Sequence, residues 1–397
     1  MTYKAIITNY LDKLILAGLM LMMFSSAISI AGSSIGFGLA FIGWITKVLL
    51  IKDVKFNLNQ VNRGIIIFLS TILISFIGTY NLKESLADLE NYILLFLLYN
   101  IIITSISDLK YVKRLFGLAV ISIIISSLYG LIWQHYHLGV SRIESTFMAL
   151  DFGALILIYL LFAIIYLLFG EGSFNNKVKN FFLIPILLIT FIYNESRGAW
   201  LGFIGASSII FWLRSKKCII VLILLITLVI SFAPKDIKDR IHSITNVESN
   251  RSNLGRIALW KGAILIFKDY PINGIGLGNF REVYMSSYKQ PHTVANSHAH
   301  NTFLHLLAEA GIIGFCGLIY LLYSILKYLY NNYCKIKDNN YGLFILATWG
   351  AVIGVFIIQG LTETNFDRAV VARTMWFIIG LSTVIIENGE WENDSIL

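Results

Sequence analysis

The residues that could do chemistry gather in one long polar stretch, which runs from Phe232 to Leu318. It contains three of the four prolines, and its polar part returns to the membrane through His298-Ala299-His300-Asn301. An imidazole at a membrane surface can act as a general base, because histidine titrates near neutral pH. Two histidines separated by one residue also suggest a metal site, but no carboxylate or third histidine has a helical or loop spacing in the sequence that would complete it. We therefore expect His300 to be a candidate base, with His298 and Asn301 in support and no metal.

A second candidate is Arg197, in the short segment Asn194-Glu195-Ser196-Arg197-Gly198 between two apolar runs. This position predicts an arginine at the rim of the membrane. The planar guanidinium group suits phosphate oxygens, which it can bind through two hydrogen bonds. The alternative is an arginine that snorkels to lipid headgroups.

Arg256 is the third candidate, in the segment Ser252-Asn253-Leu254-Gly255-Arg256. Ser252 or Asn253 can cap a helix that runs to about Phe267. We expect an apolar stripe on that helix, which would lie on the membrane or on other helices and consist of Ile257, Trp260, Ile264 and Phe267. Taken alone, Arg256 is better explained as a solvated charge at the edge of the stripe.

The elements that must position these side chains are membrane helices. The chain is 57% hydrophobic and 14% charged over 397 residues, with a mean hydropathy of +0.74, which is typical of a polytopic membrane protein. The three cysteines, Cys218, Cys316 and Cys334, are scattered, so neither a disulfide framework nor a zinc site is expected. The class is therefore all-α.

Apolar runs long enough to span a bilayer predict about twelve helices. They are Leu14–Ala31, Ser34–Ile51, Gly64–Thr79, Tyr92–Ile106, Leu115–Trp133, Leu150–Phe169, Phe181–Tyr193, Gly198–Leu213, Ile219–Phe232, Ile312–Tyr330, Tyr341–Ile358 and Val370–Ile386. We expect three regions. Residues 1–232 hold the first nine helices, 233–301 form a large external loop with an amphipathic helix, and 302–397 hold an interfacial segment, the last three helices and a cytoplasmic tail.

The net charge of +8 is mainly a topology signal and does not indicate nucleic-acid binding. Most of the 31 Lys and Arg residues fall on one face of the predicted helices, which the positive-inside rule makes cytoplasmic. Both termini are then cytoplasmic and the long loop is external. The short loops of the external face hold few basic residues, namely Lys83, Arg142, Arg197, Arg368 and Arg373.

Gly274-Ile275-Gly276-Leu277-Gly278-Asn279 looks superficially like a nucleotide-binding glycine loop. It follows no predicted strand and lacks the spacing of that motif. We interpret it as a turn that brings the chain back toward the membrane.

At the histidines the sequence resembles the O-antigen ligase and O-antigen polymerase superfamily. O-antigen ligases carry a His, then Asn, Ser or Gln, nine residues, Gly, two residues, and Gly, Thr or Val. His300-Asn301, Thr302–Ala310, Gly311 and Gly314 satisfy this motif. The predicted helices, the large loop between the ninth and tenth, and the positions of Arg197 and Arg256 are also similar to the family.

The resemblance implies a fold of about twelve helices, similar to the GT-C glycosyltransferases, in a bacterial inner membrane. It implies metal-independent, inverting transfer of a glycan from undecaprenyl pyrophosphate to lipid A-core on the periplasmic face, with no cofactor. Arg197 and Arg256 would bind the pyrophosphate, His300 would take the acceptor's proton, and Asn301 would orient His300 or the acceptor.

Two other acceptors fit the same chemistry: a second lipid-linked repeat, as in a Wzy-type polymerase, or a protein hydroxyl, as in a protein O-oligosaccharyltransferase. A secondary transporter is a further alternative, but transporters place ionisable groups near the bilayer midplane. Here the polar groups gather at predicted helix ends and in one loop. Outer helix-end residues that could line the same cavity, or form ordinary ion pairs, are Arg142, Glu144, Glu363, Asp367, Arg368 and Arg373.

Overall fold

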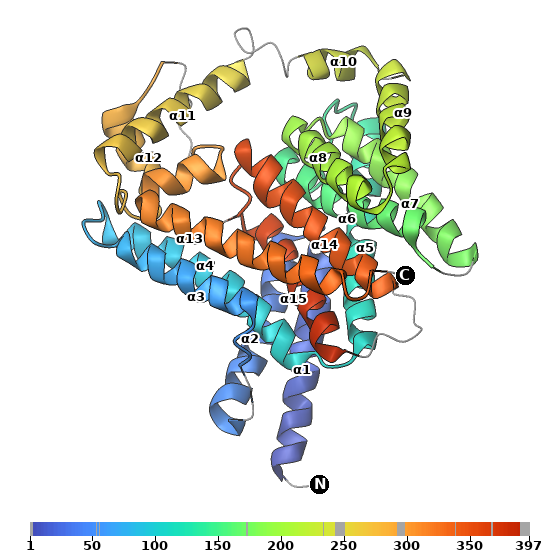
Figure 1. Cartoon of the computed structure of the whole chain (residues 1–397), viewed down its shortest axis with the longest axis horizontal. Coiled ribbons are helices and arrows are strands. Elements are labelled where there is room, and N and C mark those ends of the chain that lie inside the picture. Colours follow the sequence, from blue (N-terminus) through green and yellow to red (C-terminus); the bar gives the residue numbers. More distant parts are fainter. Residues whose placement is uncertain are drawn as a thin grey trace.

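The computed structural model describes residues 3–52, 54, 56–171, 174–232, 234–242, 251–291, 298–337, 339–366 and 368–389, and these residues form helices joined by turns and short loops (Figure 1). In order the elements are α1 (Tyr3–Ser25), α2 (Ile30–Thr46) with the π-helical η1 (Lys47–Ile51), α3 (Gln60–Ile74), α4 (Leu82–Ser105), α5 (Leu109–Leu128) with the π-helical η2 (Tyr129–His137), α6 (Ala149–Phe169), α7 (Phe174–Tyr193), α8 (Arg197–Arg214) and α9 (Lys217–Phe232). They continue with α10 (Lys235–His242), α11 (Arg251–Asp269), α12 (Phe280–Val283) with the π-helical η3 (Tyr284–Tyr288), α13 (Thr302–Tyr333), α14 (Asn340–Ala351) with the π-helical η4 (Val352–Ile358) and the 3₁₀ turn η5 (Gln359–Leu361), and α15 (Ala369–Asn388).

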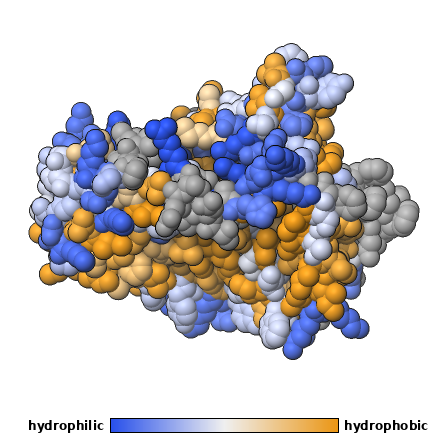
Figure 2. Space-filling model, turned by 90° about the horizontal axis from the view of Figure 1, so that it is seen from above, coloured by the Kyte–Doolittle hydropathy of each residue, from blue (hydrophilic) through white to orange (hydrophobic). Residues whose placement is uncertain are grey.

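Within the described residues, eight helical stretches are long and apolar enough to cross a membrane. Three shorter apolar helices lie at Gln60–Ile74, Leu183–Tyr193 and Lys217–Leu228. The polytopic helical class is therefore confirmed. Each of the twelve predicted runs overlaps a helix, but the number twelve stays a prediction. Figure 2 shows one face of the corresponding surface, on which hydrophobic residues form a band with hydrophilic residues along both of its edges.

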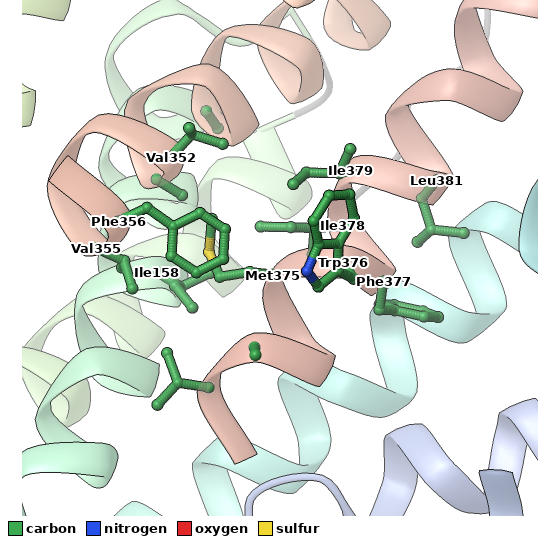
Figure 3. Close-up of a cluster of buried hydrophobic side chains, with 14 of the residues drawn as sticks. Ile158, Val352, Val355, Phe356, Met375, Trp376, Phe377, Ile378, Ile379 and Leu381 are labelled. Atoms are coloured by element: carbon green, nitrogen blue, oxygen red, sulfur yellow. The ribbon is translucent and has the colours of Figure 1, made fainter. Parts of the chain in front are cut away.

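The core is built from α6, α14 with its extensions, and α15. Their apolar stretches are 78%, 83% and 78% buried, whereas those of α1 and α2 are only 28% and 33% buried. Figure 3 shows Ile158 of α6, Phe356 of η4 and Met375 of α15 in one cluster of buried side chains. The Trp376 ring also packs edge-on against Phe96 of α4, with 4.9 Å between ring centroids. A rigid centre of this kind can hold the ends of these helices in fixed relative positions.

The segment between α9 and α13 has an apolar core of its own. Leu259, Ala263 and Ile266 of α11 pack with Phe280, Tyr284 and neighbouring side chains, and α11 lies alongside α13 (Figure 1). Ile264 of the predicted stripe is 41% exposed, so this stripe is not the face of α11 that packs here, and its contact with lipid stays a prediction. The packed face includes Gly262, whose missing side chain lets the Tyr284 ring lie directly against α11.

α9 ends at Phe232 and α13 begins at Thr302. Whether the three sequence regions behave as separate domains, and on which side of the membrane the intervening segment lies, stay predictions. Of the expected C-terminal tail, the part from residue 390 onward lies outside the described residues.

The glycines at 274, 276 and 278 form a turn packed against α13. All three have positive φ (69°, 90° and 71°), a conformation that glycine adopts without strain. The N–H groups of Ile275 and Gly276 donate to the carbonyls of Ala308 and Glu309, at 3.1 and 2.8 Å. This α13 segment ends in a kink at Gly311, where φ is 60° and ψ is −164°.

Gly311→Ala is expected to destabilise the protein by about 1–3 kcal/mol, because this backbone region is essentially restricted to glycine. A Cβ here would also overlap the carbonyl of Ile272. Thermal unfolding of the purified protein in detergent measures the loss. Gly38→Ala is the matched control, since a Cβ at that helical position meets nothing within 4 Å. Equal unfolding temperatures for the two variants would contradict the role given to the kink.

Candidate functional site: an arginine-lined cavity

A cavity of about 210 Å³ lies where α8, α10, α11 and the start of α13 meet. Arg197, Arg256 and His300, which are far apart in sequence, all line it. The remaining lining residues are Arg142, Leu150, Glu195, Gly198, Arg240, Arg251, Ser252, Gly255 and Leu259. The tertiary structure thus brings the three main sequence candidates to one place.

Arg197 is the first residue of α8 and is held from the opposite helix. It is 8% exposed, and its Nη2 donates to Asn253 Oδ1 of α11 at 2.8 Å. Because α11 begins at Arg251, Asn253 lies within its first turn and is not the cap that the sequence predicts. Its side chain binds Arg197 instead. The next residue after Arg197, Gly198, packs against Thr362, which brings α8 next to Glu363.

Glu363 joins the other two candidates through its two carboxylate oxygens. Oε1 pairs with Arg256, and Oε2 accepts a hydrogen bond from His300 Nδ1 at 2.9 Å. The carboxylate side chain is only 4% exposed, so the charge-assisted bonds are little screened by water. A proton on Nδ1 leaves the lone pair on Nε2, so Glu363 selects the tautomer in which Nε2 is the basic nitrogen.

The backbone around His300 is fixed by several hydrogen bonds. His300 has φ 50°, which is rare for a residue other than glycine, and its carbonyl accepts from Trp260 Nε1 at 3.4 Å. Asn301 caps α13: its Oδ1 accepts from the N–H groups of Phe303 and Leu304, both at 3.0 Å, and its amide donates to Leu361. Asn301 thus fixes the start of the helix that follows His300 directly. Strained residues cluster at functional sites, because the surrounding structure must hold them there.

Arg142 and Arg240 also reach the cavity. Arg142 Nε donates to the Asn194 carbonyl at 3.0 Å, while its Nη2 is buried with no hydrogen-bond partner among the described residues. Burial, followed by the charge of Arg240, lowers the pKa of Arg142. Arg240 lies 3.7 Å from the Glu195 carboxylate. Among the described residues, five arginines and one glutamate line the cavity, and a lining this rich in guanidinium groups suits an anion.

Sequence reasoning singled out Arg142 and Glu363 only as possible lining residues and gave no role to Arg240, Arg251 or Glu195. Arg142 did carry a signal, since it departs from the positive-inside pattern. Glu363 follows an apolar run and looks like an ordinary helix-end charge. Glu195 has φ 54°, which the sequence does not reveal.

The histidine pair does have a carboxylate neighbour in space. Ligand atoms of His298, His300 and Glu363 lie within 4.8 Å of one another, so the expectation that no carboxylate completes this set is wrong. Glu363 is 63 residues beyond His300 and comes from another part of the bundle. Its two oxygens already bind Arg256 and His300, and a cation would have to displace a guanidinium group from a positively charged cavity. The residues fit an anion better than a metal.

The structure is a polytopic helical membrane protein with an arginine-rich cavity. Residues 182–319 match the family model for O-antigen ligase, which confirms the resemblance over that region. The matched residues include Arg197, Arg256, His300 and Asn301, while Arg142 and Glu363 lie outside the match.

A protein of Haemophilus influenzae, whose function is uncharacterised, is 26% identical to this chain over 223 residues. The alignment covers 51% of this chain and 56% of that relative. The chain thus spans little more than half the length of this relative.

His298 provides a pH test of the site's packing. Burial, followed by the charge of His300, lowers the pKa of His298 from 6.5 to about 2. Because the neutral imidazole is favoured in the folded state, its contribution to stability is fully present above pH 6.5 and is lost as the pH falls below that value. We expect the unfolding temperature to drop between pH 7.5 and 5, and His298→Gln to reduce that drop. His137→Gln, at an exposed position, is the control, and an unchanged pH dependence in His298→Gln would contradict the burial argument.

Proposed function

We propose that this protein is a glycosyltransferase that moves a glycan from undecaprenyl pyrophosphate to a hydroxyl acceptor at the outer face of a bacterial inner membrane. The observation that carries this proposal is the meeting of Arg197, Arg256 and His300 in one cavity. The match to O-antigen ligase supports an activity of the ligase or polymerase type. The acceptor that best fits the ligase assignment is lipid A-core.

The proposed reaction is a displacement at the anomeric carbon. The acceptor oxygen forms the new glycosidic bond as the bond from that carbon to the phosphate oxygen breaks, with inversion. The acceptor proton passes to Nε2 of His300, and Glu363 stabilises the imidazolium that forms. The electron pair leaves with polyprenyl pyrophosphate, whose growing charge Arg197 and Arg256 stabilise.

No metal ion takes part in this proposal, because fixed guanidinium groups supply the positive charge that a divalent cation would otherwise provide. Arg256 is held in place by Glu363, and Arg197 by Asn253. Guanidinium groups that are already held in position need little rearrangement when charge develops on the leaving group. Glu363 thus serves both the base and one of the phosphate-binding arginines.

Arg256→Ala and His300→Ala are each expected to lower kcat/KM about 10²–10³-fold, as happens when a stabilising donor or base is lost. The measurement is glycan transfer by purified protein supplied with a lipid-linked glycan and, in separate reactions, lipid A-core, a second lipid-linked repeat or an acceptor protein. Arg281→Ala, an exposed arginine of α12 outside the cavity, is the matched control. Full activity in Arg256→Ala or His300→Ala would remove the assignment, and the acceptor that supports turnover distinguishes ligase from polymerase or protein transferase.

Chelation distinguishes the guanidinium mechanism from a metal mechanism. We expect excess EDTA to leave the rate of transfer unchanged within about twofold, because no step of the proposed reaction uses a cation. The experiment tests for a metal because the ligand atoms of His298, His300 and Glu363 lie within 4.8 Å of one another. A loss of activity that Mg²⁺ or Zn²⁺ restores would show that this cluster binds a catalytic metal.

Solute transport is the competing class. The ionisable residues of the site are gathered around one cavity, and two of them, His300 and Glu363, are paired as a base and its carboxylate. That arrangement favours chemistry at a bound anion. Uptake of a solute into proteoliposomes without any glycan transfer would favour the transporter instead.

A further inference from the structure

A small pocket lies between the start of α13 and the segment that carries Glu363. Its volume is about 10 Å³, which is about the space that one water molecule needs. Three polar residues line it, namely Thr302 and His305 of α13 and Thr364, which directly follows Glu363. The rest of the described lining is aromatic or aliphatic, and every one of these lining residues is buried. The pocket is therefore a polar spot in an apolar part of the bundle.

Two of these residues present a polar atom that lacks a hydrogen bond. His305 Nδ1 and Thr364 Oγ1 are both buried, and neither has a hydrogen-bond partner among the described residues. The two residues are 8% and 2% exposed, so bulk solvent does not satisfy these atoms. A buried polar atom is costly to leave unpaired, and an ordered water commonly satisfies such atoms.

The His305 ring is held in one orientation by groups on its other side. Its Nε2 lies 3.4 Å from Glu309 Oε2, and Oε1 of the same carboxylate accepts from the Phe280 N–H at 3.0 Å. The Phe280 ring packs edge-on against the imidazole, with 5.2 Å between ring centroids. A carboxylate beside Nε2 favours a proton on that nitrogen, so Nδ1 keeps a lone pair and can accept a hydrogen bond.

The third polar residue of the pocket, Thr302, already binds Glu363. Its N–H and its hydroxyl both donate to the Glu363 carbonyl, at 3.1 and 3.0 Å. A hydroxyl that donates in this way still has oxygen lone pairs that can accept. The pocket thus lies where the first turns of α13 meet residues 363 and 364, and its polar groups belong to both sides of that junction.

We propose that the pocket binds one water molecule that positions Glu363. The water donates to His305 Nδ1 and to Thr302 Oγ1, and it accepts from the Thr364 hydroxyl, so both unpaired atoms are satisfied. About three hydrogen bonds are typical of a buried water. None of the described lining residues is a carboxylate, a lysine or an arginine, so an ion is a poorer occupant than a neutral molecule that both donates and accepts.

The inference rests on the proposed function, which gives Glu363 its role beside the base. Thr302 fixes the carbonyl of Glu363, and the water ties the next residue, Thr364, to α13. The backbone is then held at two successive residues, and the Glu363 carboxylate keeps its place in the site. His305 and Thr364 are positioning residues in this arrangement, because they act through the water and touch no reactant.

Two pairs of variants of the full chain test this role. His305→Gln keeps a donor near the position of Nε2, where Glu309 lies, and loses Nδ1, whereas His305→Asn keeps an acceptor near the position of Nδ1 and loses Nε2. Thr364→Val removes the hydroxyl, and Thr364→Ser retains it. Thr374→Val is the matched control, because Thr374 is also 2% exposed and its hydroxyl donates to the Val370 carbonyl of its own helix at 3.1 Å.

We expect His305→Gln and Thr364→Val to lower kcat for glycan transfer about tenfold and to change KM less than about twofold, because the base is misplaced while the substrates still bind. His305→Asn, Thr364→Ser and Thr374→Val should stay within about threefold of the unmodified protein, since the water keeps its partners. A purely structural role of His305 through Glu309 predicts the reverse order of the two His305 variants. That reverse order, or an unchanged kcat in Thr364→Val, would overturn the positioning role.

A high-resolution structure of the purified protein tests the water site without any measurement of activity. We expect one water within hydrogen-bond distance of His305 Nδ1 and Thr364 Oγ1. In Thr364→Val, or in His305→Gln if the former does not fold, the hydrogen bond between His300 and Glu363 should be longer than its present 2.9 Å. A direct hydrogen bond between His305 and Thr364, or an unmoved Glu363 in the variant, would contradict the inference.

The two measurements also separate this inference from the proposed function. If the unmodified protein transfers no glycan to any acceptor, the proposed function is wrong. The structures of the unmodified protein and the variants then still decide whether a water in this pocket holds Glu363 in place.

Discussion

The site depends on a single buried carboxylate, that of Glu363. One of its oxygens neutralises Arg256 and the other orients the His300 ring. Burying a charge is costly unless it is paired and hydrogen-bonded, so Glu363 needs both partners and each partner needs Glu363. The requirement ties α11, the start of α13 and the turn after η5 to one another, although these segments are far apart in sequence.

The rest of the bundle can be understood as the support for that interaction. The buried centre of α6, η4 and α15 fixes where α14 and its extensions end, and Glu363 follows two residues after that end. The kink at Gly311 and the glycine turn at residues 274–278 anchor α13 to the segment that carries α11. Close backbone approach at these glycines lets two irregular segments share hydrogen bonds, which matters where few water molecules can satisfy them.

Composition, apolar run lengths and a short histidine motif were enough to predict a helical membrane protein, to place its apolar runs, and to select Arg197, Arg256 and His300. These features can be read from short stretches of sequence, because the thickness and apolar character of the bilayer set the length and composition of each helix and because each side chain has its own chemistry. The tertiary structure alone decided that Glu363 is the partner of both Arg256 and His300, and that Arg142 and Arg240 face the cavity. It also decided which face of α11 is buried, the face on which Tyr284 packs against Gly262. Such pairings are made across dozens to hundreds of residues, and hydrophobic periodicity carries no information about which helix ends meet.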